Sequence, residues 1–415
     1  MQEINIIPPI ILALVFALIT IRQVGNIRLA IWQIMLMGAA AAILTGSITP
    51  LSALAAIDID VMLFLFCMFV VGEAMVESGY LNHLAYGLFR RARSVDSLVL
   101  FVLFIMGFFS AFLMNDTVAI IGTPLVLYFA KRHGVSHKLM LLALCFATTI
   151  GSVPSPIGNP QNLLIALSGQ VADPFVTFFA WLAVPTLLNM LLAYGVLRLF
   201  FWKEFHSTPI VTKPEPVTDE GMAALCRLSL ILIFSLVALK VVSVSFGFFD
   251  IRLTWIAVAA AVPILGLSQD RGRILRKIDW HTLVFFASMF VLMEAVWDSN
   301  LIQQYVSDSS RAVSTGAVMA SGVLVSQLLS NVPFVALYLP VLTHAAASIK
   351  EFMALAAGST IAGNLLILGA ASNIIVIQNA EKRAGKTITF LDFAKVGIPL
   401  TALNALVYRA YFSLY

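Results

Sequence analysis

FLMNDTVAIIGTP, residues 112–124, places Asn115, Asp116 and Thr117 in the middle of apolar sequence. The apolar run on either side is too short to cross a hydrocarbon core of roughly 30 Å comfortably and return. The stretch therefore predicts a re-entrant helical hairpin over residues 97–131, whose polar tip lies at membrane depth. Such a tip is tolerated only where protein or a water-filled cavity surrounds it.

Asp116 is the most informative residue of this stretch, because an acid at the centre of a bilayer costs roughly 2.5–3.5 kcal/mol on insertion scales. Desolvation raises the pKa of a carboxyl group, and a bound cation lowers it. One acid can therefore alternate between holding a proton and pairing with a cation, which makes Asp116 the candidate proton-coupling residue. The alternative is an acid that caps the following helix. Glu73 and Glu294, inside two other apolar spans, are second proton carriers or, alternatively, partners that brace a scaffold.

The composition excludes an ordinary soluble protein. Of 415 residues, 60% are hydrophobic and 11% are charged, whereas a soluble domain averages about 25% charged residues. Runs of about 20 apolar residues recur along the chain, so we predict an all-α polytopic membrane protein. The net charge is +4, and the basic residues sit at span ends, where they determine topology instead of binding nucleic acid. The three cysteines lack a CxxC pattern and are expected to be buried, inert thiols.

The chain repeats itself, with an offset that falls stepwise from its N-terminal to its C-terminal end. IRLA at Ile27 matches IRLT at Ile251, and longer apolar stretches match around polar residues. Chance similarity of apolar stretches is the alternative, but it does not account for matched polar positions. The aligned polar pairs are Glu73 with Glu294, Asn115 with Asn331, Gly158 with Gly369, and Asn162 with Asn373.

The repeat predicts an inverted-topology architecture. Each half contains five predicted crossings and one hairpin that does not cross, and because five is odd the second half enters the membrane inverted. The whole chain then has about ten crossing helices, two of them broken, plus two re-entrant hairpins. The predicted boundaries are a first repeat over 1–202 with hairpin 97–131 and broken helix 139–168, a linker over 203–224, and a second repeat over 225–415 with hairpin 312–349 and broken helix 352–379.

The basic residues predict the orientation. Twenty of the 25 Lys and Arg residues fall on one side of this topology, which the positive-inside rule makes cytoplasmic. Both termini are then outside the inner (plasma) membrane and the linker is cytoplasmic. The first hairpin opens from the cytoplasm and the second from outside.

Four polar elements recur as two pairs, namely two hairpin tips and two broken spans. Pro154, Pro156 and Pro160 remove three backbone donors from the first broken span, whereas glycines and small residues unwind the second. Unwound carbonyls suit cations and the N-terminal ends of half-helices suit anions. We expect a binding site where the four elements converge, although kinks that merely help packing are the alternative. The candidate ligands are Asn115, Asp116, Thr117, Ser155, Gly158, Asn159, Asn162, Ser330, Asn331, Gly363, Asn364, Gly369, Ser372 and Asn373.

These motifs resemble a known family. FLMNDTVAIIGTP, GSVPSPIGNPQNLL, LSNVPFVALYLP and GNLLILGAASN are similar to the paired signatures of the ion transporter superfamily. It includes arsenite efflux permeases, NhaD-type sodium/proton antiporters, and divalent anion/sodium symporters for citrate and dicarboxylates. The resemblance covers nearly the whole chain and implies a scaffold part and a mobile transport part. The symporters carry Ser-Asn-Thr at both tips, whereas Asn115-Asp116-Thr117 and Ser330-Asn331-Val332 look more like the arsenite and sodium/proton branch.

The expected function is secondary transport without a cofactor. Proton-coupled export of a small inorganic solute comes first, with arsenite or antimonite as the solute, because neutral As(OH)3 can be held by amides, hydroxyls and carbonyls. Citrate, dicarboxylate or inorganic anion symport and sodium/proton antiport stay open as alternatives. The inverted repeat disfavours a channel or structural protein. We find no phosphate loop, metal-ligand cluster or nucleophile–base arrangement, so ATP hydrolysis by this chain is unsupported, and we expect a transporter, not an enzyme. A homodimer stays open as well, and the arsenite branch implies a cytoplasmic ATPase subunit.

Overall fold

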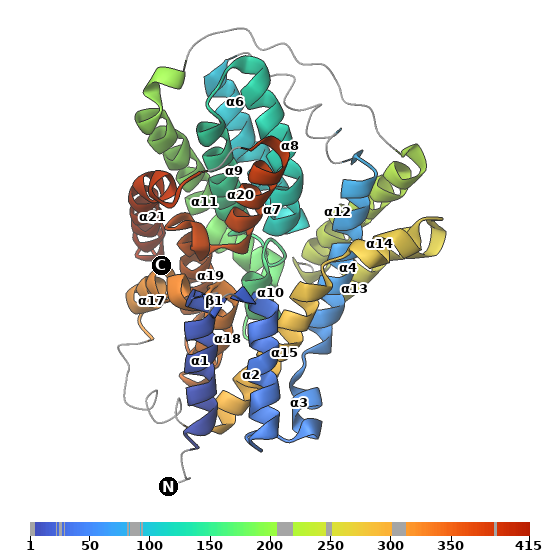
Figure 1. Ribbon diagram of the computed structural model, residues 1–415, viewed down its shortest axis with the longest axis vertical. Helices are drawn as coiled ribbons and strands as arrows, with labels where there is room; N and C mark the ends of the chain where they lie inside the picture. The colour runs from blue at the N-terminus through green and yellow to red at the C-terminus, as the bar shows by residue number, and fades with distance from the viewer. Residues whose placement is uncertain are drawn as a thin grey trace.

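The fold is almost entirely helical. The computed structural model describes residues 5–21, 23–24, 27–28, 30–80, 83, 92, 94–205, 219–245, 251–300, 313–385 and 388–415. Within them the one sheet is an antiparallel pair of two-residue strands, β1 (Gln23–Val24) and β2 (Ile27–Arg28). The predicted all-α fold class is confirmed (Figure 1). Most of the linker predicted over 203–224 lies outside the described residues.

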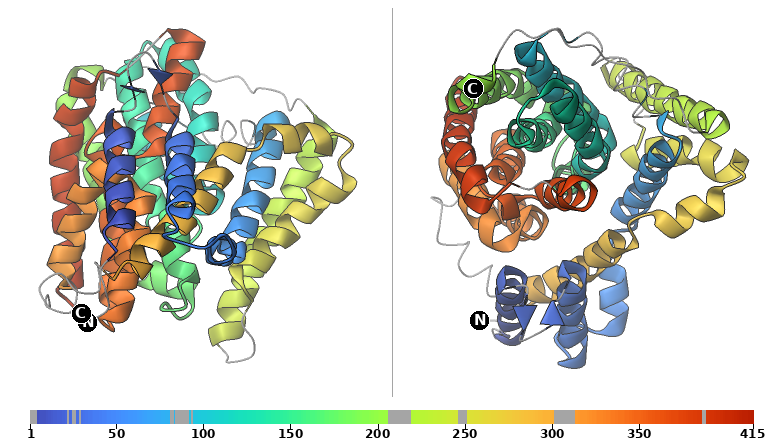
Figure 2. Two further views of the ribbon diagram at one scale, coloured as in Figure 1. Left: turned by 60° about the horizontal axis from the view of Figure 1, so that its bottom comes forward. Right: turned by 45° about the horizontal axis from the view of Figure 1, so that its top comes forward.

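The helices form two groups, which the right-hand view of Figure 2 separates. The first group, here called the layer, packs mainly through α4 against α13 and α15 against α2. It contains α1 (Ile7–Ile21), α2 (Ile31–Leu44), α3 (Pro50–Ala56), α4 (Ile59–Glu77), α12 (Glu220–Ser245), α13 (Leu253–Leu267), α14 (Arg271–Lys277) and α15 (Trp280–Asp298).

The second group, here called the bundle, contains the hairpins, the broken helices and the last long helix of each half. Its first-half members are α6 (Val95–Phe101), the π-helix η1 (Val102–Met106), α7 (Gly107–Leu113), α8 (Asn115–His133), α9 (His137–Ser152), α10 (Pro160–Leu167), α11 (Pro174–Phe200) and the short η2 (Trp202–Glu204). Its second-half members are α17 (Thr315–Leu329), α18 (Asn331–His344), α19 (Ile349–Ile361), the 3-10 turns η3 (Ala362–Asn364) and η4 (Ile367–Gly369), α20 (Ala371–Ala384) and α21 (Phe390–Phe412).

The two halves of the bundle are packed crosswise. The helix that follows the first break, α10, packs against α18 of the second hairpin, and α20, which follows the second break, packs against α8 of the first hairpin. The two last helices, α11 and α21, also pack against each other. Each break is therefore held next to a hairpin of the other half.

One expectation about the first hairpin is wrong in part. Its first arm is continuous over Val95–Leu113, 19 residues with a mean hydropathy of 2.3, and is long and apolar enough to cross a membrane. The expectation was that each flank of the tip is too short to cross comfortably and return, and by length and composition the helix that contains the first flank is long enough to cross once. What ends the arm is the backbone at Met114, where φ is +65° and the next helix begins at Asn115.

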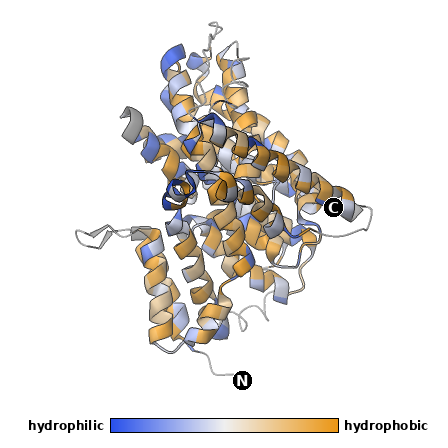
Figure 3. Cartoon of the chain, turned by 90° about the vertical axis from the view of Figure 1, so that its right-hand side faces the viewer, coloured by the Kyte–Doolittle hydropathy of each residue, from blue (hydrophilic) through white to orange (hydrophobic). Residues whose placement is uncertain are grey.

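The surface suits a lipid environment. Among the described residues, six helices are long and apolar enough to span a membrane, and four shorter helices are also apolar. Figure 3 shows helices that are largely apolar along their lengths. Large apolar side chains point outward, as with Leu187 and Leu191 of α11, which are 55% and 52% exposed. Contiguous exposed apolar surface of this kind marks contact with a membrane or a partner.

Candidate functional site

The two hairpin tips share an unusual backbone. Met114 and Ser330 both have a positive φ, +65° and +68°, and each directly precedes the asparagine that begins the next helix. Non-glycine residues rarely adopt this conformation, and they persist in it where the surrounding structure enforces it, often at functional sites. Asn115 donates its backbone N–H to the carbonyl of Gly158 at 2.9 Å, so the first tip rests on the first break.

The two breaks share a hydrogen bond at aligned positions. Asn162 donates its side-chain amide to the carbonyl of Ser152 at 3.2 Å, and also to the carbonyls of Val153 and Ser155. Asn373 donates its amide to the carbonyl of Gly363 at 2.6 Å, at the position that aligns with Ser152. Carbonyls released by the unwound backbone are thus satisfied by one asparagine in each half, which is what buried backbone requires.

Close packing explains the glycines in the breaks. A Cβ added at Gly158 would lie 2.5 Å from the carbonyl oxygen of Ser152, and one at Gly369 would lie 2.6 Å from that of Ala362. Both distances are far below van der Waals contact, so the backbone of each break can pack this closely only with glycine at that position.

The first break is tied to the second half through Thr360. The hydroxyl of Thr360 donates to the Asn162 side-chain oxygen at 3.3 Å and accepts from the Asn159 amide at 3.3 Å. Asn159 also caps α10, because its side-chain oxygen accepts from the Asn162 backbone N–H at 2.9 Å. Ser155 accepts from the backbone N–H of Ile157 at 3.3 Å. These predicted residues thus brace the break from within.

All four elements meet at one cavity of about 500 Å³. Asp116 represents the first tip there, Pro160 the first break, Ser330 the second tip and Ala371 the second break. Each of these residues lies at the beginning of a helix, so four partial positive charges approach the cavity. Of the fourteen candidate ligands, Asp116 and Ser330 line the cavity, and the other twelve are not among the residues that line it.

Asp116 brings an unpaired acid to this cavity. Its Oδ1 atom is buried and has no hydrogen-bond partner among the described residues. Its backbone N–H donates to the Asn115 side-chain oxygen at 3.0 Å. Thr117 faces the layer instead, because a Cβ on Gly72 of α4 would lie 2.9 Å from the Thr117 hydroxyl.

The layer supplies the opposite wall of the cavity, which the sequence did not reveal. Trp32 of α2 and His281 of α15 stack their rings with centroids 4.9 Å apart. Asp279 begins α15 as its cap, with its Oδ1 accepting from the Thr282 backbone N–H at 3.0 Å. Asp279 aligns with Asp58, which caps α4 in the same way. This match was the one feature of the sequence that could have pointed to Asp279 as part of the wall. No Lys or Arg is among the described residues that line the cavity.

The second tip and second break carry several polar oxygens without partners. The side-chain oxygens of Asn331, Asn364, Asn373 and Ser372 are buried and have no hydrogen-bond partner in the described part of the chain. Gln327 of α17 donates its amide to the Ala362 carbonyl at 2.7 Å, and its own oxygen is likewise unpaired. Free oxygens of this kind are acceptors for a cation or for hydroxyl groups of a solute.

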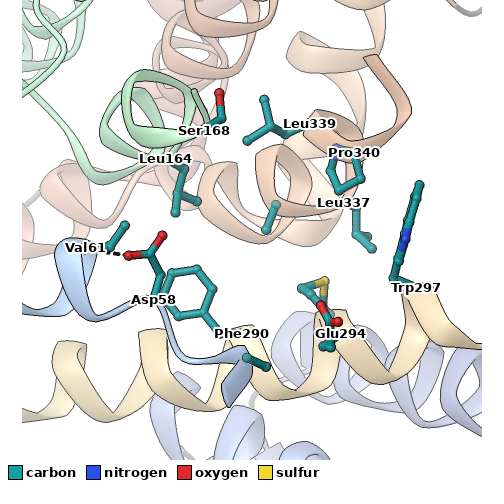
Figure 4. A pocket seen from close by; sticks show the side chains of 13 residues that line it. Asp58, Val61, Leu164, Ser168, Phe290, Glu294, Trp297, Leu337, Leu339 and Pro340 are labelled. Carbon is teal, nitrogen blue, oxygen red and sulfur yellow. Dashed lines mark hydrogen bonds between the residues drawn. The ribbon is translucent and has the colours of Figure 1, made fainter. Parts of the chain in front are cut away.

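Glu73 and Glu294 lie away from this cavity. Glu73 is half-buried on α4, one turn before Glu77, which pairs with Arg273 at 2.9 Å and also with Lys277. Glu294 lines a second cavity of about 390 Å³ between α15, α18 and the start of α4. Figure 4 shows Glu294 and Asp58 on the walls of that cavity.

Comparisons with known proteins agree on the class of protein. The model of the citrate transporter family matches residues 14–352. An uncharacterized transporter of Mycobacterium tuberculosis is 24% identical over 378 residues, which cover 86% of each protein. A silicon efflux transporter of Oryza sativa subsp. japonica is 27% identical over 438 residues, covering 88% of this chain and 89% of that protein.

Two solved structures are similar in fold. The YdaH transporter of Alcanivorax borkumensis, described as having an unusual topology, has a TM-score of 0.58 at 14% identity and covers 98% of this chain and 97% of that one. MtrF of Neisseria gonorrhoeae, placed in a class of antimetabolite efflux pumps, has a TM-score of 0.50 at 13% identity, with 98% and 94% covered. At such identities the likeness concerns the fold alone.

Proposed function

This chain belongs to the citrate transporter family and is a multi-pass membrane transporter, not an enzyme, and from that premise we propose proton-coupled export of a small inorganic solute. Arsenite or antimonite is the first candidate. Asp116 carries the proton, and the tips and breaks hold the solute. The bundle, which carries both hairpins and both breaks, is the mobile part, and the layer is the scaffold.

The cavity shared by all four polar elements carries this proposal. Its described walls hold two carboxyl groups, from Asp116 and Asp279, and no Lys or Arg. A highly charged anion would meet these carboxylates without a basic partner, which is costly away from water. A neutral hydroxide such as As(OH)3 needs hydrogen bonds only. Silicon, the element named for the rice relative, also forms a neutral hydroxide near pH 7.

The driving force suffices for export. Moving one charge through 100 mV releases about 2.3 kcal/mol. Because the free energy of a solute gradient is RT times the logarithm of the concentration ratio, this energy supports a solute gradient of roughly fiftyfold. One proton per solute therefore supports a useful gradient. The unpaired buried oxygen of Asp116 is the group that would take up and release that proton.

Symport of citrate, a dicarboxylate or an inorganic anion is the second candidate. Four helices begin at the cavity, and helix N-termini favour anions. The description of the matching family as a citrate transporter also favours it. Sodium/proton antiport is the third candidate, supported by Asp116 and by the unpaired oxygens of the second tip and break.

The orientation and assembly belong to the same proposal. We place the protein in the inner (plasma) membrane with both termini outside. In the left-hand view of Figure 2, the beginning of α1 and the end of α21 lie at the same end of the molecule, which supports placing both termini on one side of the membrane. A homodimer, and a cytoplasmic ATPase subunit in the arsenite case, are the assemblies to test by purification from membranes.

Counterflow in proteoliposomes separates the three candidates. Purified protein is reconstituted, and exchange of arsenite, silicic acid, citrate, succinate, sulfate and sodium is compared, each with and without a proton gradient. Uphill movement of arsenite driven by protons is the expected result. Exchange of citrate alone would replace the proposal with the second candidate, and sodium movement coupled to protons alone would replace it with the third.

A further inference from the structure

Three buried asparagines form a chain of amide hydrogen bonds behind the second break. Asn404 of α21 donates its Nδ2 to Oδ1 of Asn189 on α11 at 2.9 Å. Asn364, in η3 of the second break, donates its Nδ2 to Oδ1 of Asn404 at 3.2 Å. All three side chains are completely buried. This chain, here called the amide relay, connects the contact between the two last helices with one predicted site residue.

The relay leaves one polar atom without a partner at each of its ends. An asparagine offers one oxygen acceptor and one NH2 donor. In the structure Asn404 gives its NH2 group to Asn189 and its oxygen to Asn364, so Asn364 presents its own NH2 to Asn404, and Nδ2 of Asn189 stays buried without a hydrogen-bond partner in the described part of the chain at the other end. Oδ1 of Asn364 is then left over, and this atom is buried without a partner among the described residues. The relay therefore leaves an acceptor at the second break.

Close packing of α21 fixes the same segment. A Cβ at Gly397 of α21 would lie 2.2 Å from the backbone oxygen of Asn364, so the backbone of α21 lies directly against the break. The first half has no equivalent relay, because the position aligned with Asn364 is Val153. The first break is braced by the amide of Asn162, which binds three carbonyls.

We propose that Asn404 and Asn189 are positioning residues that orient the Asn364 amide for solute binding at the second break. The proposal rests on the proposed function, in which Asn364 belongs to the solute site. Loss of the Asn404 amide frees Asn364 to rotate and loosens the break. Solute affinity then falls, while the rate at saturating solute is largely kept, because the change acts through the shape of the second break and none of the three asparagines lines the cavity.

The structure offers a matched control for this test. Thr186 and Tyr408 join the same two helices, with their hydroxyl oxygens 2.7 Å apart and both side chains buried. Each lies about one turn from the corresponding relay residue, and their shared bond does not involve the break. Tyr408 also interacts with Asn189, so Thr186→Val is the cleaner control: it removes a bond from the same helix contact without touching the relay, whereas Asn404→Leu removes the relay.

Hydrogen–deuterium exchange tests the relay without any solute. In the full-length protein, Asn404→Leu is expected to accelerate amide exchange of residues 362–370 at least fivefold and to leave residues 153–159 unchanged. Thr186→Val should leave both segments within twofold of the parent. Unchanged exchange at 362–370 in Asn404→Leu, or equal acceleration by Thr186→Val, would show that the relay only holds two helices together and would overturn the proposal.

Counterflow with arsenite and with citrate tests the link to binding. Asn404→Leu should raise KM for the transported solute by about five- to tenfold, as expected for loss of one hydrogen bond, with the maximal rate within twofold. The double variant with Asn364→Ala should be no worse than Asn364→Ala alone. Additive effects or an unchanged KM would refute the relay. If the parent exchanges neither solute, the proposed function fails, and the exchange measurement alone decides whether the relay positions the break.

Discussion

Asp116 is the residue at which burial, charge and position come together. Its Oδ1 is buried without a partner at the cavity where the tips and breaks meet. If it carries the coupling proton, Asp116→Asn keeps the shape of the side chain and cannot titrate. We expect proton-driven uphill transport to be lost, while solute-for-solute exchange, which needs no net proton movement, is retained. Both are measured in the same proteoliposomes.

Asp279 provides the control for this experiment, because it is the other acid on the wall of the same cavity. It caps α15, and asparagine caps helices about as well as aspartate. Asp279→Asn should therefore keep uphill transport. Equal loss in both variants would point to a general effect of charge in the cavity. Retained uphill transport in Asp116→Asn would remove Asp116 from the mechanism.

The paired tip asparagines give the second prediction at this scale. Asn115 and Asn331 are 7% and 6% exposed and begin α8 and α18. Leaving buried polar partners unpaired costs about 1–3 kcal/mol, so Asn115→Ala and Asn331→Ala should each weaken solute counterflow by roughly 5- to 100-fold. The amount of folded protein, followed by size-exclusion chromatography, should change little.

Thr123→Val is the matched control for the tip variants. Thr123 is buried on α8 and bonds only within its own helix, at the carbonyl of Ala119. The Thr123→Val variant should therefore transport solute at the same rate as the parent protein. Parent-like transport by both tip variants would mean that the asparagines only shape the tips.

The breaks are the elements on which the site depends, and their glycines give a prediction. Gly158→Ala and Gly369→Ala would place a Cβ 2.5 and 2.6 Å from a carbonyl oxygen. Such overpacking costs about 1–3 kcal/mol, so both variants should unfold at a lower temperature and lose transport. Differential scanning fluorimetry and counterflow measure the two effects.

Gly195→Ala is the control for this pair. Gly195 lies inside α11 with open space where a Cβ would stand, and alanine in such a helix is favoured by about 0.5–1 kcal/mol. Its unfolding temperature should rise or stay the same. A similar fall in unfolding temperature and in transport in all three variants would contradict the steric explanation.

Among the helices and breaks, the sequence predicted those features that polar residues inside apolar runs mark, such as the hairpin tips. Asn115 and Asn331 indicated where helices begin, because a polar residue in an apolar run is costly unless the chain turns there. The sequence could not reveal the wall made by Trp32 and His281, since their neighbours come from distant parts of the chain. Nor could it show that the first arm of the first hairpin is one continuous helix over Val95–Leu113.

The amide relay could not be predicted from the repeat. Asn189 and Asn404 lie on the last helix of each half at an offset of 215, whereas the two breaks before them align at an offset of 211. Only packing shows that Asn404 bonds both Asn189 and Asn364.

For the whole molecule, the distribution of charge makes a prediction about orientation. Twenty of 25 basic residues fall on the proposed cytoplasmic side, so the positive-inside rule places the linker there. A single cysteine introduced at Lys213 should react with membrane-impermeant thiol reagents only after the membrane is opened. If the cysteine at position 213 is labelled in intact cells, the proposed orientation is wrong and each hairpin opens from the opposite side.

The crosswise packing of α10 on α18 and of α20 on α8 has a consequence for biosynthesis. When the ribosome has finished the first half, α8 can pack against α9 and α10 against α4, but the contacts of α8 with α20 and of α10 with α18 form only after residues 225–415 have been made. At about 5–20 residues per second this delay is roughly 10–40 s. Newly made first halves should therefore depend on a membrane chaperone or insertase, and two half-genes should yield stable protein only when they are expressed together.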